Sequence, residues 1–101
     1  MNQVYLEGYI KDRLDNDGNF IFVTYDKKGN EIELVCDISN YSNDTFYIIS
    51  HYNYVKLYGN IKRSSLLENK IYIDKAEEFS EEKYKLNLEE QKELYNKRNK
   101  K

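Results

Sequence analysis

Tyrosine and basic side chains occupy alternate positions in two short segments of the chain, residues 3–11 and 54–64. Alternation of this kind places side chains together on one face of a strand. Aromatic rings can stack on single-stranded bases at roughly 1–3 kcal/mol per base, while lysine and arginine neutralise phosphates. The residues that could carry this chemistry are Tyr5, Tyr9, Lys11, Tyr54, Lys56, Tyr58, Lys62 and Arg63.

A third segment, residues 19–26, adds aromatic side chains that alternation alone does not assign to a face. Phe20, Phe22 and Tyr25 could point outward, but Ile21 and Val23 could fill the core equally well. We expect at least one of these aromatics to lie outside. Phe22 is therefore included among the candidate nucleic-acid contacts.

Residues suited to catalysis or metal binding are sparse. His51 is the only histidine and has no nucleophile or paired carboxylate near it in the sequence. Cys36 is the only cysteine, and the acidic run Asp12, Asp15 and Asp17 lacks the other ligands of a calcium loop. No phosphate-binding glycine loop is present. We expect a protein that is not an enzyme and that uses no metal and no cofactor.

Composition describes one small domain with a modest core. The chain has 101 residues, of which 40% are hydrophobic and 34% charged. It has no apolar run long enough to span a membrane, no signal-peptide pattern and no disulfide framework, so we expect a cytoplasmic location. Residues 1–79 hold nine basic and thirteen acidic side chains. Such an acidic body is unusual for a nucleic-acid binder, whose affinity comes largely from neutralised phosphates.

Hydrophobic alternation predicts strands over residues 3–11, 31–38, 54–64 and 70–79, and a β-branched and aromatic run predicts another over residues 19–26. The loop Lys27 to Asn30 joins the second and third strands as a hairpin. In the first, third, fourth and fifth strands, the side chains expected to face the core are Val4, Leu6, Ile10, Ile32, Leu34, Cys36, Ile38, Val55, Leu57, Ile61, Ile71 and Ile73.

Two helices complete the prediction. Asn43 or Asp44 could cap a short helix between the third and fourth strands. Its buried side would carry Phe46, Ile49 and Tyr52. Asn87 followed by Glu90 resembles a capping box and predicts a helix from there to about Asn99. Its narrow apolar stripe would consist of Leu88, Gln91, Leu94 and Tyr95. We predict a domain over residues 1–79 and a charged helical tail over 80–101, which either docks or forms a mobile basic arm.

Five strands with a helix between the third and fourth is the element order of the OB-fold, a five-stranded Greek-key barrel. Val4-x-Leu6-x-Gly8 and Val55-x-Leu57-x-Gly59 place a glycine at equivalent points of the first and fourth strands. Glycine inside a strand commonly marks a bend or a close backbone approach. The sequence thus predicts a mainly β OB-fold barrel with a C-terminal helix, and another five-stranded barrel, such as an SH3-like one, is the alternative.

The same two motifs resemble a known family. "MNQVYLEGYIKD" is similar to the opening of bacterial single-stranded DNA-binding proteins, and "VKLYGNIKRSS" is similar to their fourth strand. This resemblance implies an OB domain that binds single-stranded DNA without sequence preference, and RNA is not excluded. That family commonly carries stacking aromatics on the third strand, whereas this chain has Glu31, Glu33, Val35 and Asp37 there. It also ends Lys-Arg-Asn-Lys-Lys instead of in an acidic tail. We therefore expect a specialised relative from a plasmid, phage or conjugative element.

Two other interpretations stay open. Tyrosine is enriched at protein interfaces, so the same tyrosines could cover barrel edges or form a homo-oligomer contact. The eleven tyrosines also reflect a composition typical of an AT-rich genome. The acidic third strand could instead bind a protein partner, which would make the chain a regulator or inhibitor built on an OB-like barrel.

Overall fold

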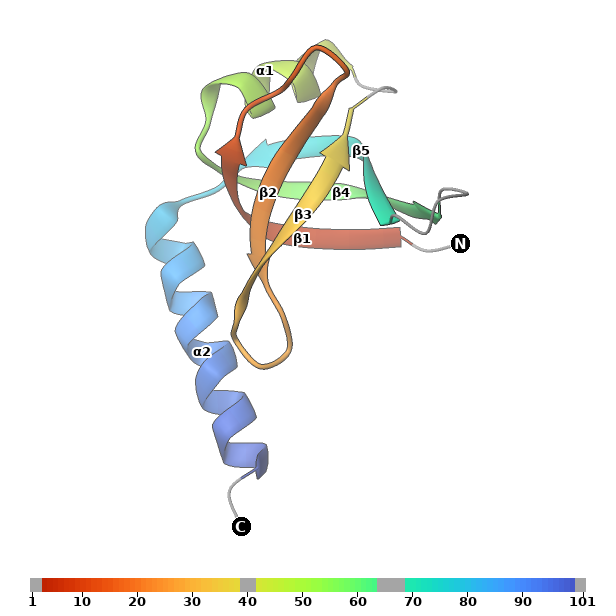
Figure 1. Cartoon of the computed structure of the whole chain (residues 1–101). Coiled ribbons are helices and arrows are strands. Elements are labelled where there is room, and N and C mark those ends of the chain that lie inside the picture. The colour runs from red at the N-terminus through yellow and green to blue at the C-terminus, as the bar shows by residue number, and fades with distance from the viewer. Residues whose placement is uncertain (1–2, 39–41, 64–68, 100–101) are drawn as a thin grey trace.

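The computed structural model describes residues 3–38, 42–63 and 69–99. Its elements follow the order β1 (Gln3–Asp12), β2 (Asn19–Tyr25), β3 (Glu31–Asp37), α1 (Asn43–His51), β4 (Tyr54–Arg63), β5 (Asn69–Glu78) and α2 (Glu81–Asn99). The strands close a barrel in the order β1-β2-β3-β5-β4 (Figure 1). The prediction of a mainly β, five-stranded barrel with a helix between the third and fourth strands and a C-terminal helix is confirmed. None of the helices described is long and apolar enough to cross a membrane.

The two Val-x-Leu-x-Gly motifs lie against each other. β1 and β4 are antiparallel, and their register pairs Val4 with Gly59, Leu6 with Leu57 and Gly8 with Val55. Each glycine therefore faces the valine of the other motif across a local two-fold axis at the leucine pair.

The glycines in these motifs allow the backbone of a neighbouring strand to approach closely, β2 at Gly8 and β5 at Gly59. A methyl group on Gly8 would overlap the carbonyl oxygen of Val23 in β2, and one on Gly59 would overlap that of Tyr72 in β5. A strand curling this tightly has no room for a side chain at the point of contact. The repeated glycine is thus a requirement of barrel closure at two neighbouring positions.

Both ends of β2 carry the same five-residue turn, Asp-x-x-Gly-Asn. In each turn the aspartate carboxylate, of Asp15 or of Asp26, accepts hydrogen bonds from the backbone N–H groups two and four residues later. The glycines, Gly18 and Gly29, adopt a φ of 81°, which side chains disfavour. These turns hold β1, β2 and β3 as a meander.

The core explains which sequence predictions fail. Phe20, Phe22 and Cys36 are all buried, and burial raises the pKa of the Cys36 thiol to about 12, so this cysteine is an inert core residue. The expected inward positions Ile32 and Ile61 are 37% and 36% exposed. Within the described residues β3 pairs with β5 through Cys36 and Asp37 alone, so the Ile32 end of the β2–β3 hairpin projects beyond the barrel (Figure 1).

Both helices differ in detail from the prediction. Ser42, and neither Asn43 nor Asp44, caps α1 by accepting a hydrogen bond from the Thr45 N–H, and Phe46 is 44% exposed while Ile49 is buried. α2 begins at Glu81, six residues before the predicted start. Ser80 initiates it, because its hydroxyl accepts the Lys83 N–H and its carbonyl accepts the Tyr84 N–H.

Candidate nucleic-acid interface

The outer face of β1 and β4 presents three cross-strand pairs of polar and aromatic residues. Their register pairs Tyr5 with Tyr58, Glu7 with Lys56 and Tyr9 with Tyr54. The two aromatic pairs have ring centroids 5.0 Å and 5.4 Å apart. We refer to these six residues as the tyrosine ladder. The strand alternation that predicted four outward tyrosines in one place is correct.

One end of the tyrosine ladder is covered by α2. The Tyr84 ring lies 5.9 Å from Tyr9 and 5.6 Å from Tyr54, and it is only 2% exposed. Its hydroxyl donates a 2.9 Å hydrogen bond to Glu31. In this arrangement the rings of Tyr9 and Tyr54 pack against Tyr84 and remain only partly exposed, so less of their surface is open to a base.

Further contacts along α2 hold the helix in this position. Asn87 donates a hydrogen bond to Glu7 at 2.9 Å, and Gln91 donates one to the Lys27 carbonyl at 2.7 Å. Gly29 lies directly under Lys92, where even a methyl group would collide with the lysine. The helix therefore runs from the ladder down to the tip of the β2–β3 hairpin (Figure 1).

The other end of the ladder remains open. Tyr5 is 46% exposed and Tyr58 is partly exposed, and the two rings contact each other. Lys75 of β5 places its Nζ 5.6 Å from the Tyr58 ring centroid, and Lys56 places its Nζ 5.4 Å from that of Phe79. Aromatic faces and ammonium groups thus alternate across this part of the sheet.

The tyrosine hydroxyls donate to neighbouring carboxylates. Tyr5 donates to Glu7 at 2.6 Å and Tyr58 donates to Glu77 at 3.1 Å. Burial, followed by the hydrogen bond to Glu7, raises the pKa of Tyr5, and the hydrogen bond to Glu77 is the main cause of the raised pKa of Tyr58. Both phenols stay neutral near pH 7. The carboxylates beside them repel phosphate, and Lys75 shares this side of the rings with Glu77, with which it forms an ion pair at 3.6 Å.

Basic residues gather at the far end of the β4–β5 hairpin. The backbone register sets Lys62 opposite Lys70 and Arg63 opposite Asn69. Between residues 60 and 72 the sequence has three basic side chains and one acidic one, whereas residues 19–37 have two basic and four acidic. A phosphate backbone that leaves Tyr58 along β4 would therefore move toward positive charge.

The structure sorts the predicted contacts into groups. It brings Tyr5 and Tyr58 together at the open end and places Tyr9 and Tyr54 against Tyr84 of α2. Lys56 lies between them, opposite Glu7, with its Nζ over the Phe79 ring. Lys11 lies at the covered end and forms an ion pair with Glu33 at 2.5 Å. The side chains of Lys62 and Arg63 lie outside the described part of the structure.

Phe22 requires a correction. It is fully buried in the barrel, so it cannot stack on a base on the surface. Of the three aromatics of β2, only Tyr25 reaches the outside, where its ring lies 5.8 Å from Tyr84.

Sequence reasoning also missed two residues that shape this face. Tyr84 was not predicted because the expected helix began after it, although Ser80 four residues earlier is a suitable N-cap. Lys75 belongs to the outer side of β5, as its pairing opposite Tyr58 shows. Alternation continued from the inward Ile73 would turn Lys75 inward as well, and only the shift in register between Tyr58 and Gly59 turns it outward.

Comparisons with known proteins identify the fold. No protein-family model matches this sequence, and no curated protein matches it. A chain of the Stn1-ten1 complex from S. pombe superposes with a TM-score of 0.60 at 19% identity, covering 97% of this chain and 73% of that one. OBody NL8 bound to hen egg-white lysozyme gives 0.56 at 13%, over 80% and 97% of the two chains. The chain has an OB-fold.

A third similar structure is the Replication Protein A heterotrimer bound to ssDNA. One of its chains superposes with a TM-score of 0.51 at 12% identity, covering 97% of this chain and 74% of that one. A match over 97% of the chain includes most of α2, so the similarity to this structure and to the S. pombe complex extends beyond the barrel. At these identities the likeness concerns the fold.

Proposed function

We propose that this protein binds single-stranded DNA without catalysis, through the open end of the tyrosine ladder and the basic end of the β4–β5 hairpin. The observation that carries this proposal is the exposed Tyr5–Tyr58 pair, which lies beside Lys56 and Lys75 and continues along β4 toward Lys70. Stacking of bases on such rings tolerates any sequence because every base has an aromatic face.

The fold supports this function at a general level. Faces and loops of OB barrels commonly hold oligonucleotides, and the similar Replication Protein A structure is bound to ssDNA. The covered half of the ladder and the carboxylates beside the rings reduce the contact area. We therefore expect weaker binding and a smaller salt dependence than an open, basic OB face would give. RNA could use the same contacts, so it belongs in the test.

Fluorescence anisotropy with labelled oligo-dT and oligo-U, at low and at high salt, tests the proposal. The double variant Tyr5→Ala/Tyr58→Ala should bind oligo-dT at least about tenfold more weakly, because each stacked base contributes roughly 1–3 kcal/mol. Tyr47→Ala is the matched control, since Tyr47 is a 54% exposed tyrosine on α1. Absence of salt-sensitive binding by the wild type, or equal losses in the two variants, would overturn the proposal.

Binding of a protein partner through the outer face of β3 is the second candidate function. The observation that favours it is the exposed Val35 between acidic neighbours, at 39% exposure, together with the protein-bound state of OBody NL8. However, Glu31 already accepts a hydrogen bond from Tyr84, and Glu33 already forms an ion pair with Lys11, so both carboxylates have partners within the chain. A stable complex with a host protein that Glu33→Ala/Asp37→Ala abolishes, in the absence of DNA binding, would favour this alternative.

A further inference from the structure

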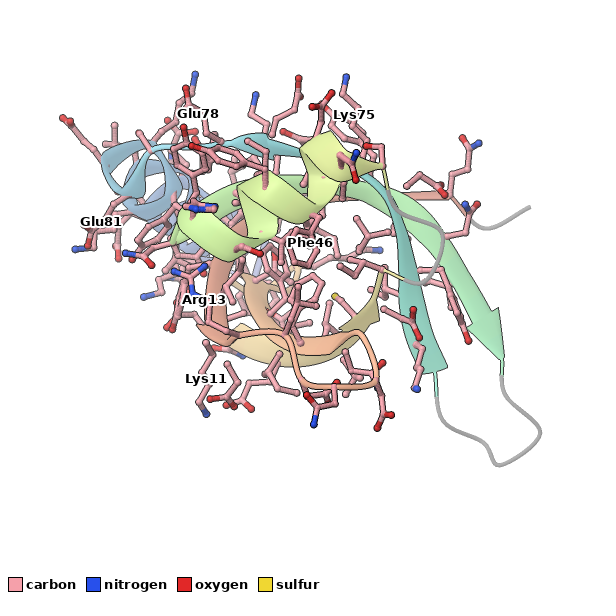
Figure 2. The ribbon with its side chains drawn as sticks, turned by 90° about the horizontal axis from the view of Figure 1, so that it is seen from above. Lys11, Arg13, Phe46, Lys75, Glu78 and Glu81 are labelled. Atoms are coloured by element: carbon pink, nitrogen blue, oxygen red, sulfur yellow. The ribbon has the colours of Figure 1, made fainter. Side chains whose placement is uncertain are left out.

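A shallow groove of mixed polarity lies at the end of the barrel opposite the free end of α2. It runs between the β1–β2 loop and α1, where two adjoining hollows of about 340 Å³ and 560 Å³ share the side chains of Leu14, Asp15 and Phe46. Ile38 forms part of the floor of the first hollow. Figure 2 looks down onto this end and shows Phe46 on the side of α1 that faces the loop. Phe46 is 44% exposed, which is a large apolar surface for a side chain beside a hollow.

The rim of this groove is acidic. Asp15 and Asp17 both line it. Among the described residues that line the groove, the one cation is Arg13, whose guanidinium already donates to the carbonyls of Ile49 and Tyr52 and to Asn53. An occupant should therefore combine an apolar side chain with positive charge.

The last turns of α2 have this combination. Leu94 is 51% exposed, and Lys97 and Arg98 follow three and four residues later, also exposed. Side chains at these spacings share one face of a helix. From Leu94 to Arg98 the helix has two cations and no carboxylate.

Within one molecule these two surfaces are far apart. The groove lies at the α1 end of the barrel, whereas α2 leaves the barrel at the opposite side and ends beyond the β2–β3 hairpin (Figure 1). The helix of one copy can therefore fill the groove only of another copy.

We propose that copies of this protein associate head to tail, with Leu94 of one copy entering the Leu14–Phe46 groove of the next and with Lys97 and Arg98 facing Asp15 and Asp17. A contact of this heterologous type leaves a free groove at one end and a free helix at the other, so it extends into chains or closes into rings. This contact uses a different surface from the tyrosine ladder. If the contact does not form, the proposed DNA binding is unaffected.

The contact is small, so association is weak in free solution. Copies that share one strand of DNA would meet at a much higher local concentration, and the contact would then appear as cooperative binding.

Sedimentation velocity over a concentration series up to about 1 mM tests the proposal, since weak contacts of this size need such concentrations. The wild type should form species larger than dimers, and added salt should dissociate them. Phe46→Ser, which alters the groove, and Leu94→Ser, which alters the helix, should each stay monomeric. Leu86→Ser is the matched control: Leu86 is a 59% exposed leucine near the start of α2, so this variant should associate like the wild type.

A mixture of the groove variant and the helix variant gives the sharpest result. Each supplies the one surface that the other lacks, so together they should form dimers and nothing larger. Circular dichroism checks that each variant is folded. A wild type that is monomeric throughout, a Leu86→Ser variant that fails to associate, or a mixture that stays monomeric or grows beyond dimers would overturn the inference.

Discussion

The two ends of the tyrosine ladder contain the same kind of residue pair, yet they have different environments. Tyr9 and Tyr54 lie under Tyr84 of α2, whereas Tyr5 and Tyr58 remain accessible. Glu7 in the middle belongs to both ends, because one carboxylate oxygen accepts from Tyr5 and the other accepts from Asn87 of α2. Residues 1–79 alone indicate one continuous exposed aromatic face. Helix α2, which follows them in the chain, covers one end of that face and leaves the other open.

The largest effect should come from removing the cover itself. Tyr84→Ala should lower the free energy of unfolding by about 2–4 kcal/mol, because it deletes a buried aromatic ring and leaves a cavity between three other tyrosines. Urea denaturation measures the loss. Leu86→Ala on the exposed side of the same helix should change stability by less than about 0.5 kcal/mol. Equal stabilities for the two variants would mean that α2 does not dock through Tyr84.

Single truncations at the two ends should give a crossed pattern. Tyr9→Ala should destabilise the fold by about 1–3 kcal/mol and leave oligo-dT affinity nearly unchanged, since its ring is packed against Tyr84. Tyr5→Ala should cost less than about 1 kcal/mol of stability but weaken oligo-dT binding several-fold. Paired urea and anisotropy measurements on both variants show the pattern. If each of the two variants lost both binding and stability to a similar extent, the two ends of the ladder would not differ in function.

Alkaline pH should destabilise the protein, because tyrosines at both ends of the ladder have raised pKa values in the folded state. Burial, then the hydrogen bond to Glu31 and its charge, raise the pKa of Tyr84 in the folded state, and burial is also the main cause of the raised pKa values of Tyr9 and Tyr54. The unfolded chain ionises near pH 10, below the folded-state values, so this stability is fully present below about pH 10 and falls as pH rises through it. Urea midpoints measured across this range should decline, and less steeply in Glu31→Gln.

The smallest effect should come from Lys11, beside the covered end. Its ion pair with Glu33 is exposed on both sides, so Lys11→Ala should change stability by less than about 0.5 kcal/mol. Its effect on oligo-dT affinity should be smaller than that of Lys75→Ala, because Lys75 lies beside the open Tyr58 ring. A larger loss of oligo-dT affinity from Lys11→Ala than from Lys75→Ala would mean that the binding face lies at the covered end.

Most of the barrel could be predicted because it depends on local signals. Alternating apolar residues define β1, β4 and β5, and the Asp-x-x-Gly-Asn turns define the two loops around β2. β2 itself gave no clear alternation, because both of its faces are buried: Phe22 points into the core, while Val23 on the outer face is only 4% exposed. Where both faces are covered, a period of two disappears from the sequence.

The candidate site was less predictable, because it depends on contacts between distant segments. The outward direction of Tyr5 and Tyr58 follows from alternation in each strand. The position of Tyr84 does not, since the predicted helix began after it. Of the predicted stripe, Leu88, Gln91 and Tyr95 do lie on the less exposed side of α2, whereas Leu94 is 51% exposed. The domain boundary at residue 79, the cytoplasmic location and an origin in a mobile element stay predictions.

The pairing of the two Val-x-Leu-x-Gly motifs also has a consequence for folding kinetics. The meander of β1, β2 and β3 closes through short turns, whereas Leu6 meets Leu57 only after half of the chain has been brought back. Long-range pairings of this kind slow folding because their loop-closure entropy is lost before the contacts form. We expect the meander to form first and the β1–β4 seam to limit the rate, so that the two glycines set how quickly the barrel closes as well as whether it can.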